Sequence, residues 1–143
     1  MMVKQINVFL ENQMGRLAEV TGTLAANNID IRALYIADTT DFGILRMILD
    51  KPQEAQIVLA QAGFTVSSNP VIALAIDDVP GTLDAALAVL SENNISMEYL
   101  YAFVGRASSD AVVVIRVDNP DEALKALCKN GVKVLSSEEV YGI

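Results

Sequence analysis

An internal repeat is the feature of this sequence that most restricts its fold. An offset of 66 positions aligns Gly15 with Gly81, together with the Asn-Asn-Ile triplet that follows each glycine. Further along the chain, an offset of 68 aligns Pro52 with Pro120 and the residues around them. Agreement at nearly one offset over most of a chain is typical of a duplicated structural unit. The predicted domains are residues 1–68 and 69–143.

Hydrophobic periodicity in the first copy predicts the elements of the unit. Apolar and polar residues first alternate as in a strand, and apolar residues then recur at helical spacing. Two further alternating runs form a hairpin, Pro52 opens a second helix that stops at Gly63, and a short strand follows. The predicted order is therefore strand, helix, strand, strand, helix, strand. The corresponding spans are 3–11, 15–27, 27–38, 42–50, 52–63 and 64–68.

The chain order βαββαβ predicts the fold class, which is α+β. Right-handed crossovers place both helices of a unit on one face of a four-stranded antiparallel sheet, which is a ferredoxin-like arrangement. On the other face, alternate strand positions carry apolar residues, and an apolar open face is usually covered. We therefore expect self-association into a homodimer or another homo-oligomer. The apolar positions are Ile44, Ile48, Ala73, Ala75, Val112 and Val114.

The charge and hydropathy of the chain restrict its partners. The formal net charge is −8, and the 10 basic residues are scattered along the sequence. Nucleic-acid binding draws most of its affinity from clustered Lys and Arg, so we expect no nucleic-acid partner. No apolar run approaches the roughly 18 residues of a membrane span, and the N-terminus lacks the apolar core of a signal peptide. We expect no membrane partner and a cytoplasmic location.

Side chains suited to catalysis or metal binding are scarce. The sequence has no histidine and one cysteine, Cys128, which lies in a predicted helix and is expected to pack or to stay inert. Two pairs of adjacent carboxylates, Asp77 with Asp78 and Glu138 with Glu139, would point to opposite sides of extended strand ends, so neither pair suits acid–base chemistry. We predict a binding protein that is not an enzyme and that uses no metal and no cofactor.

Three other functions of ferredoxin-like units fit this sequence poorly. An RNA-recognition module needs exposed aromatic residues on its central strands and a basic surface, whereas Phe9 and Phe42 are isolated. A chaperone for soft metals needs a pair of cysteines in the first loop, which neither copy has. An acylphosphatase-like enzyme needs an arginine in that loop, and Arg16 has no match in the second copy, where Thr82 stands.

The first turn of each copy resembles the turn of a known family. Residues 78–83, DVPGTL, match the Asp-x-Pro-Gly-x-Leu turn of ACT domains, and residues 12–17, NQMGRL, match it except for Met14 in place of proline. Together with the chain order, these motifs make nearly the whole chain similar to a tandem pair of ACT domains. The resemblance implies a regulatory protein that binds a small ligand, usually an amino acid, where two ACT units join sheet edge to sheet edge.

The resemblance also implies two pockets, each formed by the glycine turn of one unit and the start of the second strand of the other. A glycine at the beginning of a helix leaves backbone N–H groups accessible to a carboxylate. Pocket one would comprise Asn12, Gln13, Met14, Gly15, Arg16, Ser96 and Met97. Pocket two would comprise Asp30, Ile31, Asp78, Val79, Pro80, Gly81 and Thr82.

The two pockets differ in their chemistry. Asn12 both donates and accepts hydrogen bonds and Arg16 adds positive charge, so pocket one suits an α-carboxylate held together with an α-ammonium group. In pocket two, Asp78 and Asp30 would repel a carboxylate. We expect one competent amino-acid site at pocket one, with pocket two vacant or tolerant of a cation.

A ligand sensor without a catalytic domain has to act on another molecule. Two routes are open: the protein regulates a separate enzyme of amino-acid metabolism, which we expect, or it is a ligand-holding oligomer with no fixed enzyme partner. Met14 and Met97 would supply adaptable apolar walls, which suggests a ligand with an apolar or aromatic side chain. Two alternatives stay open: a structural subunit that promotes oligomerisation without a ligand, and a small enzyme on a ferredoxin-like fold.

Overall fold

The structure is a computed structural model that describes residues 2–11, 13–38, 42–103 and 110–143. Contacts divide the chain into two compact units. The N-terminal unit is Lys4–Asn69, and the C-terminal unit is Pro70–Ile143 with the first residues of the chain up to Val3. The domain bounds 1–68 and 69–143 stay a prediction, because one strand runs through the join and the contacts alone do not define where a domain ends.

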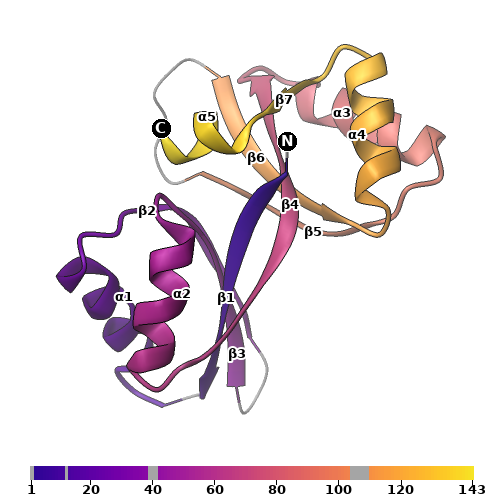
Figure 1. The fold of residues 1–143 in the computed structure, drawn as a ribbon. Helices are drawn as coiled ribbons and strands as arrows, with labels where there is room; N and C mark the ends of the chain where they lie inside the picture. Colours follow the sequence, from indigo (N-terminus) through magenta and orange to yellow (C-terminus); the bar gives the residue numbers. More distant parts are fainter. Residues whose placement is uncertain (1, 12, 39–41, 104–109) are drawn as a thin grey trace. The chain divides into compact units, whose positions relative to one another are not determined.

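The N-terminal unit follows the element order predicted for one repeat. Its elements are β1 (Val3–Glu11), α1 (Arg16–Ala26), β2 (Ile31–Asp38), β3 (Phe42–Leu49), α2 (Pro52–Gln61) and the first part of β4 (Thr65–Asp77). The strand order is β2-β3-β1-β4, and β3 pairs antiparallel with both β1 and β2. Both helices lie on one side of these strands (Figure 1).

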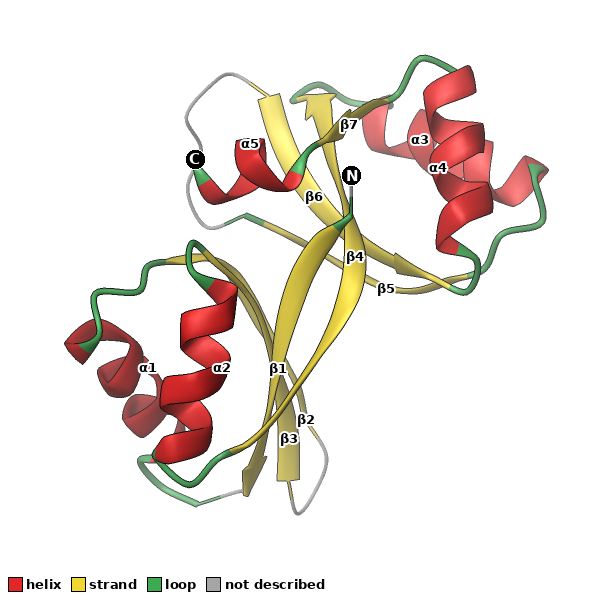
Figure 2. Ribbon diagram, in the orientation of Figure 1, coloured by secondary structure: helices red, strands yellow, loops and turns green. Residues whose placement is uncertain are grey.

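The C-terminal unit repeats the arrangement and begins with the second part of β4. Its other elements are α3 (Thr82–Glu92), β5 (Met97–Ala102), β6 (Asp110–Val117), α4 (Pro120–Lys129), β7 (Lys133–Leu135) and α5 (Ser137–Tyr141). The strand order is β5-β6-β4-β7, with antiparallel pairing throughout. Figure 2 shows the two longer helices, α3 and α4, beside these strands. The predicted α+β class with two βαββαβ units is confirmed.

Each unit has its own apolar core between the helices and one face of its sheet. In the N-terminal unit, Val20 and Leu24 of α1 pack with Leu59 of α2 and with alternate residues of β1 and β3. In the C-terminal unit, Leu90 and Leu127 take the equivalent places on α3 and α4. Burial of each such side chain stabilises the folded state by roughly 1.5–3 kcal/mol, so each unit is stabilised by a core of its own.

The strand β4 differs from the sequence prediction, which ended the first copy with a short strand at 64–68. In the structure one strand continues from Thr65 to Asp77 and serves both units. No glycine interrupts it, and Pro70 is tolerated because extended backbone suits its fixed φ. The predicted joining of the two sheets edge to edge concerns the mutual placement of the units and stays a prediction.

The C-terminal residues correct a second expectation. Glu138 and Glu139 were expected at an extended strand end, whereas both lie in the short helix α5. The Ser136 hydroxyl accepts from the Glu139 backbone N–H at 3.1 Å, and the Glu139 carboxylate accepts from the Ser136 N–H at 3.2 Å. This reciprocal capping box starts a helix that periodicity over five residues does not reveal.

The pKa of the exposed Glu138 carboxyl is lowered, first by its own backbone N–H and then by the Ser137 hydroxyl. The carboxyl is therefore ionised at neutral pH. Within the described ranges, no helix is both long enough and apolar enough to cross a membrane.

Candidate functional site

The two glycine turns have the same backbone geometry. Gly15 has φ 87° and ψ −7°, and Gly81 has φ 94° and ψ −15°, both in the left-handed region. A Cβ atom built on either glycine would meet no atom within 4 Å. Glycine is therefore required at both positions by the backbone conformation, and the space beside it is open.

The hydrogen bonds of the two turns also match. The N–H of Gln13 donates to the Glu11 carbonyl at 2.8 Å, and the N–H of Val79 donates to the Asp77 carbonyl at 2.9 Å. The N–H of Arg16 donates to the Gln13 carbonyl at 3.3 Å, and the N–H of Thr82 donates to the Val79 carbonyl at 3.4 Å. The N-cap residues Gly15 and Gly81 supply no side-chain cap. The second and third N–H groups of a helix have no partner within the helix, so in both turns these two donors suit a carboxylate.

Arg16 distinguishes the first turn from the second. Its guanidinium lies over the ring of Phe64, with Cζ 4.7 Å from the ring centroid, and Nη1 donates to Glu19 Oε2 at 2.6 Å. The side chain is 26% exposed, and among the described residues its buried Nε has no hydrogen-bond partner. The guanidinium is thus held between a ring and a carboxylate, and a ligand carboxylate would share its remaining N–H groups with Glu19.

Thr82 takes the place of Arg16 in the second turn and behaves differently. Its hydroxyl donates to the carbonyl of Val79 at 3.0 Å and to the carbonyl of Asp77. The side chain is neutral, and its hydroxyl proton is already used within the turn. The predicted chemical difference between the two turns therefore extends to their side-chain geometry.

The remaining turn residues predicted for pocket one lie at the surface. Met14 is fully exposed, and Gln13 is exposed as well. Asn12 lies outside the described residues. In the second turn Asp78, Val79 and Pro80 are exposed.

The start of β2 carries the remaining residues of pocket two, Asp30 and Ile31. The Asp30 carboxylate accepts from Arg32 Nη1 at 2.6 Å, and the backbone N–H of Asp30 donates to Asp50 at 2.8 Å. Arg32 therefore offsets part of the negative charge that the sequence analysis assigned to this position.

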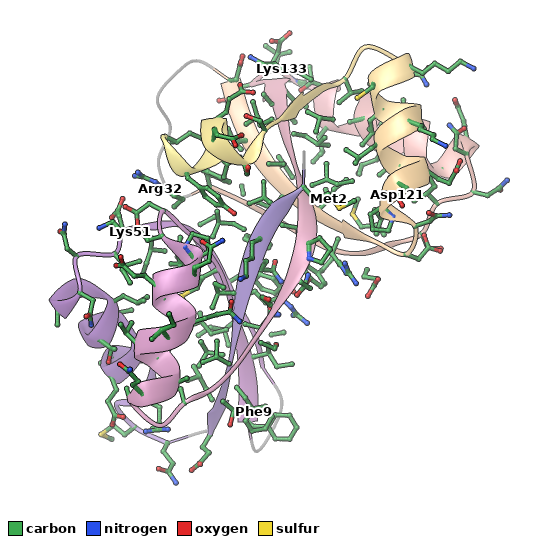
Figure 3. All side chains as sticks on the ribbon, in the orientation of Figure 1. Met2, Phe9, Arg32, Lys51, Asp121 and Lys133 are labelled. Carbon is green, nitrogen blue, oxygen red and sulfur yellow. The ribbon has the colours of Figure 1, made fainter. Side chains whose placement is uncertain are left out.

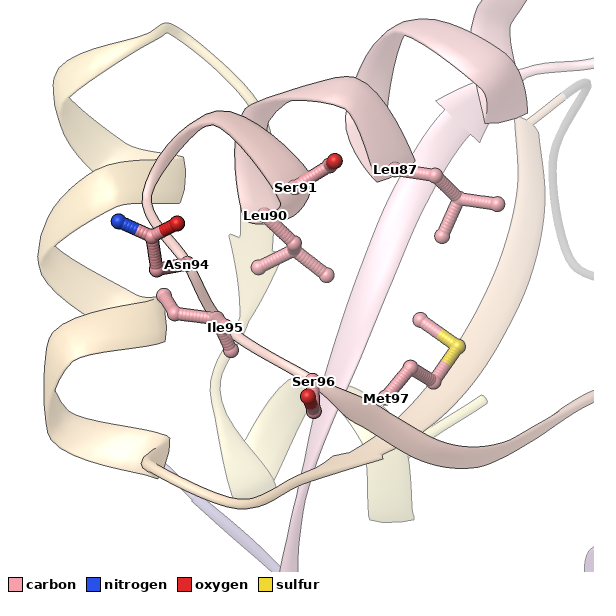
Figure 4. Close-up of a pocket in the computed structure, with 7 residues that line it drawn as sticks. All are labelled: Leu87, Leu90, Ser91, Asn94, Ile95, Ser96 and Met97. Atoms are coloured by element: carbon pink, nitrogen blue, oxygen red, sulfur yellow. The ribbon is translucent and has the colours of Figure 1, made fainter.

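The start of β5 carries the last residues of pocket one, Ser96 and Met97. The backbone N–H of Ser96 donates to the Asp118 carboxylate at 3.1 Å, as the N–H of Asp30 donates to Asp50. Within the C-terminal unit, both residues line a cavity of about 470 Å³ between α3 and β5. Figure 4 shows Leu87 of α3 and Met97 of β5 on facing walls of this cavity.

Each predicted pocket draws residues from both units. The turn residues of pocket one belong to the N-terminal unit, whereas Ser96 and Met97 belong to the C-terminal unit. In pocket two, the turn residues belong to the C-terminal unit, and Asp30 and Ile31 belong to the N-terminal unit. The structure describes the residues of each half except Asn12, and their assignment to two pockets stays a prediction.

Sequence reasoning missed two residues that shape the first turn. Glu19 lies three positions after Arg16 on α1, a spacing that predicts an ion pair. Phe64 lies far along the chain, directly before β4, and no sequence pattern links it to Arg16. Among the residues that the structure describes, no group of three or more Cys, Asp and Glu side chains is placed to hold a metal ion.

Two ferredoxin-like units with matching glycine turns define a tandem-domain architecture. The family model for the ACT domain pair matches residues 1–143, and the chain belongs to this family. The predicted resemblance to tandem ACT domains is confirmed. No curated protein matches the sequence.

Solved structures agree with this assignment. Protein BT0572 from Bacteroides thetaiotaomicron is 38% identical, with a TM-score of 0.94 over 100% of this chain and 98% of that chain. The regulatory subunit of aspartate kinase from Thermus thermophilus is 17% identical, with a TM-score of 0.62 over 90% of this chain and 92% of its own. The corresponding subunit from Thermus flavus is 18% identical, with a TM-score of 0.55 over 88% and 90%. At these low identities the two Thermus proteins share the fold.

Proposed function

We propose that the protein is a non-catalytic regulator that binds an amino acid at pocket one. The observation that carries this proposal is the first turn. There an uncapped helix N-terminus and an oriented guanidinium, that of Arg16, come from adjacent residues. Both groups favour a carboxylate, and together they bind it more strongly than either group alone.

In this proposal the ligand carboxylate accepts from the N–H groups of Leu17 and Ala18 in the first turn of α1 and from the Arg16 side chain. Asn12 accepts from the ligand ammonium group, and Gln13 lies beside it. Gly15 keeps the approach open because it has no side chain. Ser96 and Met97, at the start of β5, form the other wall of the pocket. Met14 and Met97 contact the ligand side chain.

Pocket two serves as the internal comparison. Gly81 offers the same backbone, but the Thr82 hydroxyl is engaged within the turn and Asp78 adds negative charge. The other predicted residues, Asp30, Ile31, Val79 and Pro80, supply no cation. We propose that pocket two binds no amino-acid carboxylate and stays vacant or tolerates a cation.

The proposed regulator acts on an enzyme of amino-acid metabolism and assembles as a homodimer in the cytoplasm. The Thermus proteins of similar fold are regulatory subunits of aspartate kinase, which supports a role of this kind. The proposal is separated from the two alternatives by ligand binding and turnover. A purely structural subunit would bind no amino acid, and a small enzyme would convert one.

Titration calorimetry of the full chain with the twenty amino acids tests the proposal. We expect one site per chain for one amino acid or a small group of them, and at least about tenfold weaker binding for Asn12→Ala and for Arg16→Thr. Gln61→Ala, at the end of α2, is the control and should bind like the wild type. Two equal sites, or an unchanged affinity of Asn12→Ala, would contradict the proposal.

The proposed partner requires a separate experiment. Affinity capture from the source cells, with and without the amino acid found by titration, should retain a metabolic enzyme in a ligand-dependent manner. Repeating the capture with Arg16→Thr should abolish the ligand dependence. If the enzyme is retained equally with and without the ligand, and equally by the wild type and Arg16→Thr, regulation through pocket one is contradicted.

A further inference from the structure

The cavity between α3 and β5, here called the α3–β5 cavity, indicates which amino acids suit pocket one. It has a volume of about 470 Å³, which is within the range of small-molecule sites. It shares Ser96 and Met97 with pocket one, and its other lining residues belong to α3 and to the segment that joins α3 to β5 (Figure 4). All of its lining residues belong to the C-terminal unit.

The walls of the α3–β5 cavity are apolar and lie on one side of the sheet. Leu90 and Ile95 are buried in the core of the C-terminal unit, and Leu87 and Met97 are partly buried against the same core. All four side chains therefore lie on the helix side of the sheet. Leu87 and Met97 face each other across the cavity (Figure 4). An apolar group that enters between them loses contact with water, which favours its binding.

The polar residues of the α3–β5 cavity are neutral. Ser91, Asn94 and Ser96 are exposed and form its rim. Among the described residues, none that lines the cavity carries a charge. Glu98 follows Met97 closely in the sequence, but its carboxylate lies 3.7 Å from Arg116 Nε and it is not part of the lining. A charged ligand group would therefore give up hydration here without gaining an ionic partner.

The corresponding region of the N-terminal unit is more polar. The offset of 66 positions relates Leu87 to Thr21 and Ser96 to Asp30. The Thr21 hydroxyl donates to a backbone carbonyl of its own helix at 3.1 Å. The Asp30 carboxylate forms an ion pair with Arg32 at 2.6 Å. The second copy thus has an apolar side chain and a neutral one where the first copy has a hydroxyl and a carboxylate.

Two cations of the N-terminal unit also have no counterpart in the C-terminal unit. Lys51 Nζ donates to the Asn28 carbonyl at 2.7 Å, and Arg32 and Lys51 lie at the same end of the N-terminal unit (Figure 3). The aligned residues of the second copy are Glu98 for Arg32 and Asn119 for Lys51. The two starts of the second strand therefore differ in charge, and the one that belongs to pocket one adjoins an uncharged cavity.

We propose that the ligand of pocket one is an amino acid with a neutral apolar side chain of the size of leucine or methionine, and that this side chain lies in the α3–β5 cavity between Leu87 and Met97. The inference rests on the proposed function, since it takes Ser96 and Met97 as part of pocket one. It adds the class of ligand and the residue, Leu87, that selects this class. Amino acids with charged side chains bind more weakly, because the lining offers no ionic partner.

A homologous series of unbranched amino acids tests the class of ligand. The full chain is titrated by calorimetry with alanine, 2-aminobutyrate, norvaline and norleucine. The α-carboxylate and the α-ammonium group stay constant, while the side chain grows by one methylene at each step. We expect the affinity to rise about two- to fourfold per step, as for a methylene that is partly or fully removed from water. An affinity that stays constant or falls along the series would overturn the inference.

Lysine compared with norleucine tests the exclusion of charge. Lysine has the carbon chain of norleucine and carries an additional ammonium group on its terminal carbon. We expect lysine to bind at least about fivefold more weakly than norleucine, because the ammonium group loses hydration beside Leu87 and Met97. Lysine binding as tight as that of norleucine would overturn the inference.

The variant Leu87→Trp and a matched control locate the ligand side chain. The indole should fill the cavity, weaken norleucine binding at least about tenfold and leave alanine binding within about twofold of the wild type, since a methyl group does not extend between the walls. The control is Leu124→Trp. Leu124 is also partly buried against the core of the C-terminal unit, but it lies on α4 and is not part of the lining. Wild-type norleucine affinity in Leu87→Trp, or equal losses in both variants, would overturn the inference.

A milder variant decides the question if Leu87→Trp does not fold. Leu87→Thr introduces the residue that the first copy carries at the aligned position, Thr21. It removes part of one apolar wall and should lower the ratio of norleucine affinity to alanine affinity at least about threefold. An unchanged ratio in Leu87→Thr would overturn the inference.

The variant Arg16→Thr separates this inference from the proposed function. It should weaken the binding of alanine and norleucine by the same factor, because both have the same carboxylate, whereas Leu87→Trp should weaken norleucine alone. If amino acids bind and Arg16→Thr weakens them, but the affinity is constant along the series, the proposed function stands and the cavity inference fails. If no amino acid binds, the proposed function fails, and this inference fails with it.

Discussion

The two glycine turns share a backbone and differ in one side chain that decides their chemistry. Arg16 extends from its turn to Phe64 and Glu19, whereas Thr82 bends back to the carbonyls of Asp77 and Val79. The start of α1 therefore carries an ion pair, whereas the start of α3 carries a neutral hydroxyl that is bonded within its own turn. Duplication preserved the scaffold while the side chains behind the turn diverged, so similarity of fold does not imply similarity of ligand.

The strongest test of the shared scaffold is a matched pair of core truncations. Leu24→Ala in α1 and Leu90→Ala in α3 each remove a side chain that is at most 2% exposed. We expect each variant to lower the free energy of unfolding of its own unit by about 3 kcal/mol, from lost burial and the cavity left behind. Hydrogen exchange read separately for each unit during urea denaturation measures both effects. Costs that differ by more than about twofold would show that the two cores are not equivalent.

The glycines provide the next test, because both need a positive φ. Gly15→Ala and Gly81→Ala should each lower the free energy of unfolding by about 1–2 kcal/mol, through backbone strain alone. The substituted Cβ would meet no atom within 4 Å, so no steric clash adds to this cost.

Gly22 supplies the control for these variants. It lies inside α1, it also has open space around its Cβ position, and its φ is not positive. Gly22→Ala should therefore raise the free energy of unfolding, by up to about 1 kcal/mol, because alanine favours a helix. A cost for Gly22→Ala equal to that for Gly15→Ala would point to packing as the cause.

A smaller effect distinguishes the two side chains that follow the glycines. Thr82→Val removes the hydroxyl that closes the second turn and should lower stability by about 1 kcal/mol, whereas Thr82→Ser should be near neutral. Arg16→Met keeps an unbranched chain over Phe64 without the charge and should cost about 0.5 kcal/mol. Urea denaturation of the four proteins, wild type included, decides the order. A larger loss of stability in Arg16→Met than in Thr82→Val would contradict this expected order.

The smallest expected effect concerns the second helix of each unit. Asn119 caps α4 by accepting from the Glu122 N–H at 3.5 Å, whereas Lys51 at the start of α2 makes no side-chain cap. Asn119→Ala should cost about 0.5 kcal/mol, at the lower end for a cap because the bond is long. Asn119→Asp retains an acceptor and should cost less. A shift in the thermal midpoint of Asn119→Asp as large as that of Asn119→Ala would exclude the cap as the cause.

Much of the fold follows from the repeat and from periodicity. β1 begins and ends as predicted, and α1 and α2 match their predicted spans to within two residues at each end, since Gly15, Pro52 and Gly63 mark the limits. The length of β4 was less predictable, because the alternation of an extended strand does not mark where the first unit ends and the second begins. α5 was missed, since five residues hold too little periodicity and its capping box depends on two side chains.

The candidate site was predictable only in part. The conformations of Gly15 and Gly81 and the contrast between Arg16 and Thr82 could be read from the aligned copies. The stacking of Arg16 on Phe64 depends on how α1 packs beside the start of β4, which no local pattern encodes. A cavity of about 420 Å³ in the C-terminal unit is lined by Thr82, Ala85 and Val132, each smaller than its N-terminal counterpart. It depends on these residues together, so no local pattern predicts it.

The continuous strand β4 sets a rule of parity for changes at the join. Val66 packs toward the core of the N-terminal unit, and Ile72 and Leu74 pack in the core of the C-terminal unit, so even-numbered residues serve both cores. Inserting one residue near Asn69 would keep the alternation within each half and would reverse the parity of one half relative to the other, whereas inserting two would keep the parity of both. Length and side-chain parity are therefore linked at the junction of the two copies, a counting constraint that an ordinary linker does not impose.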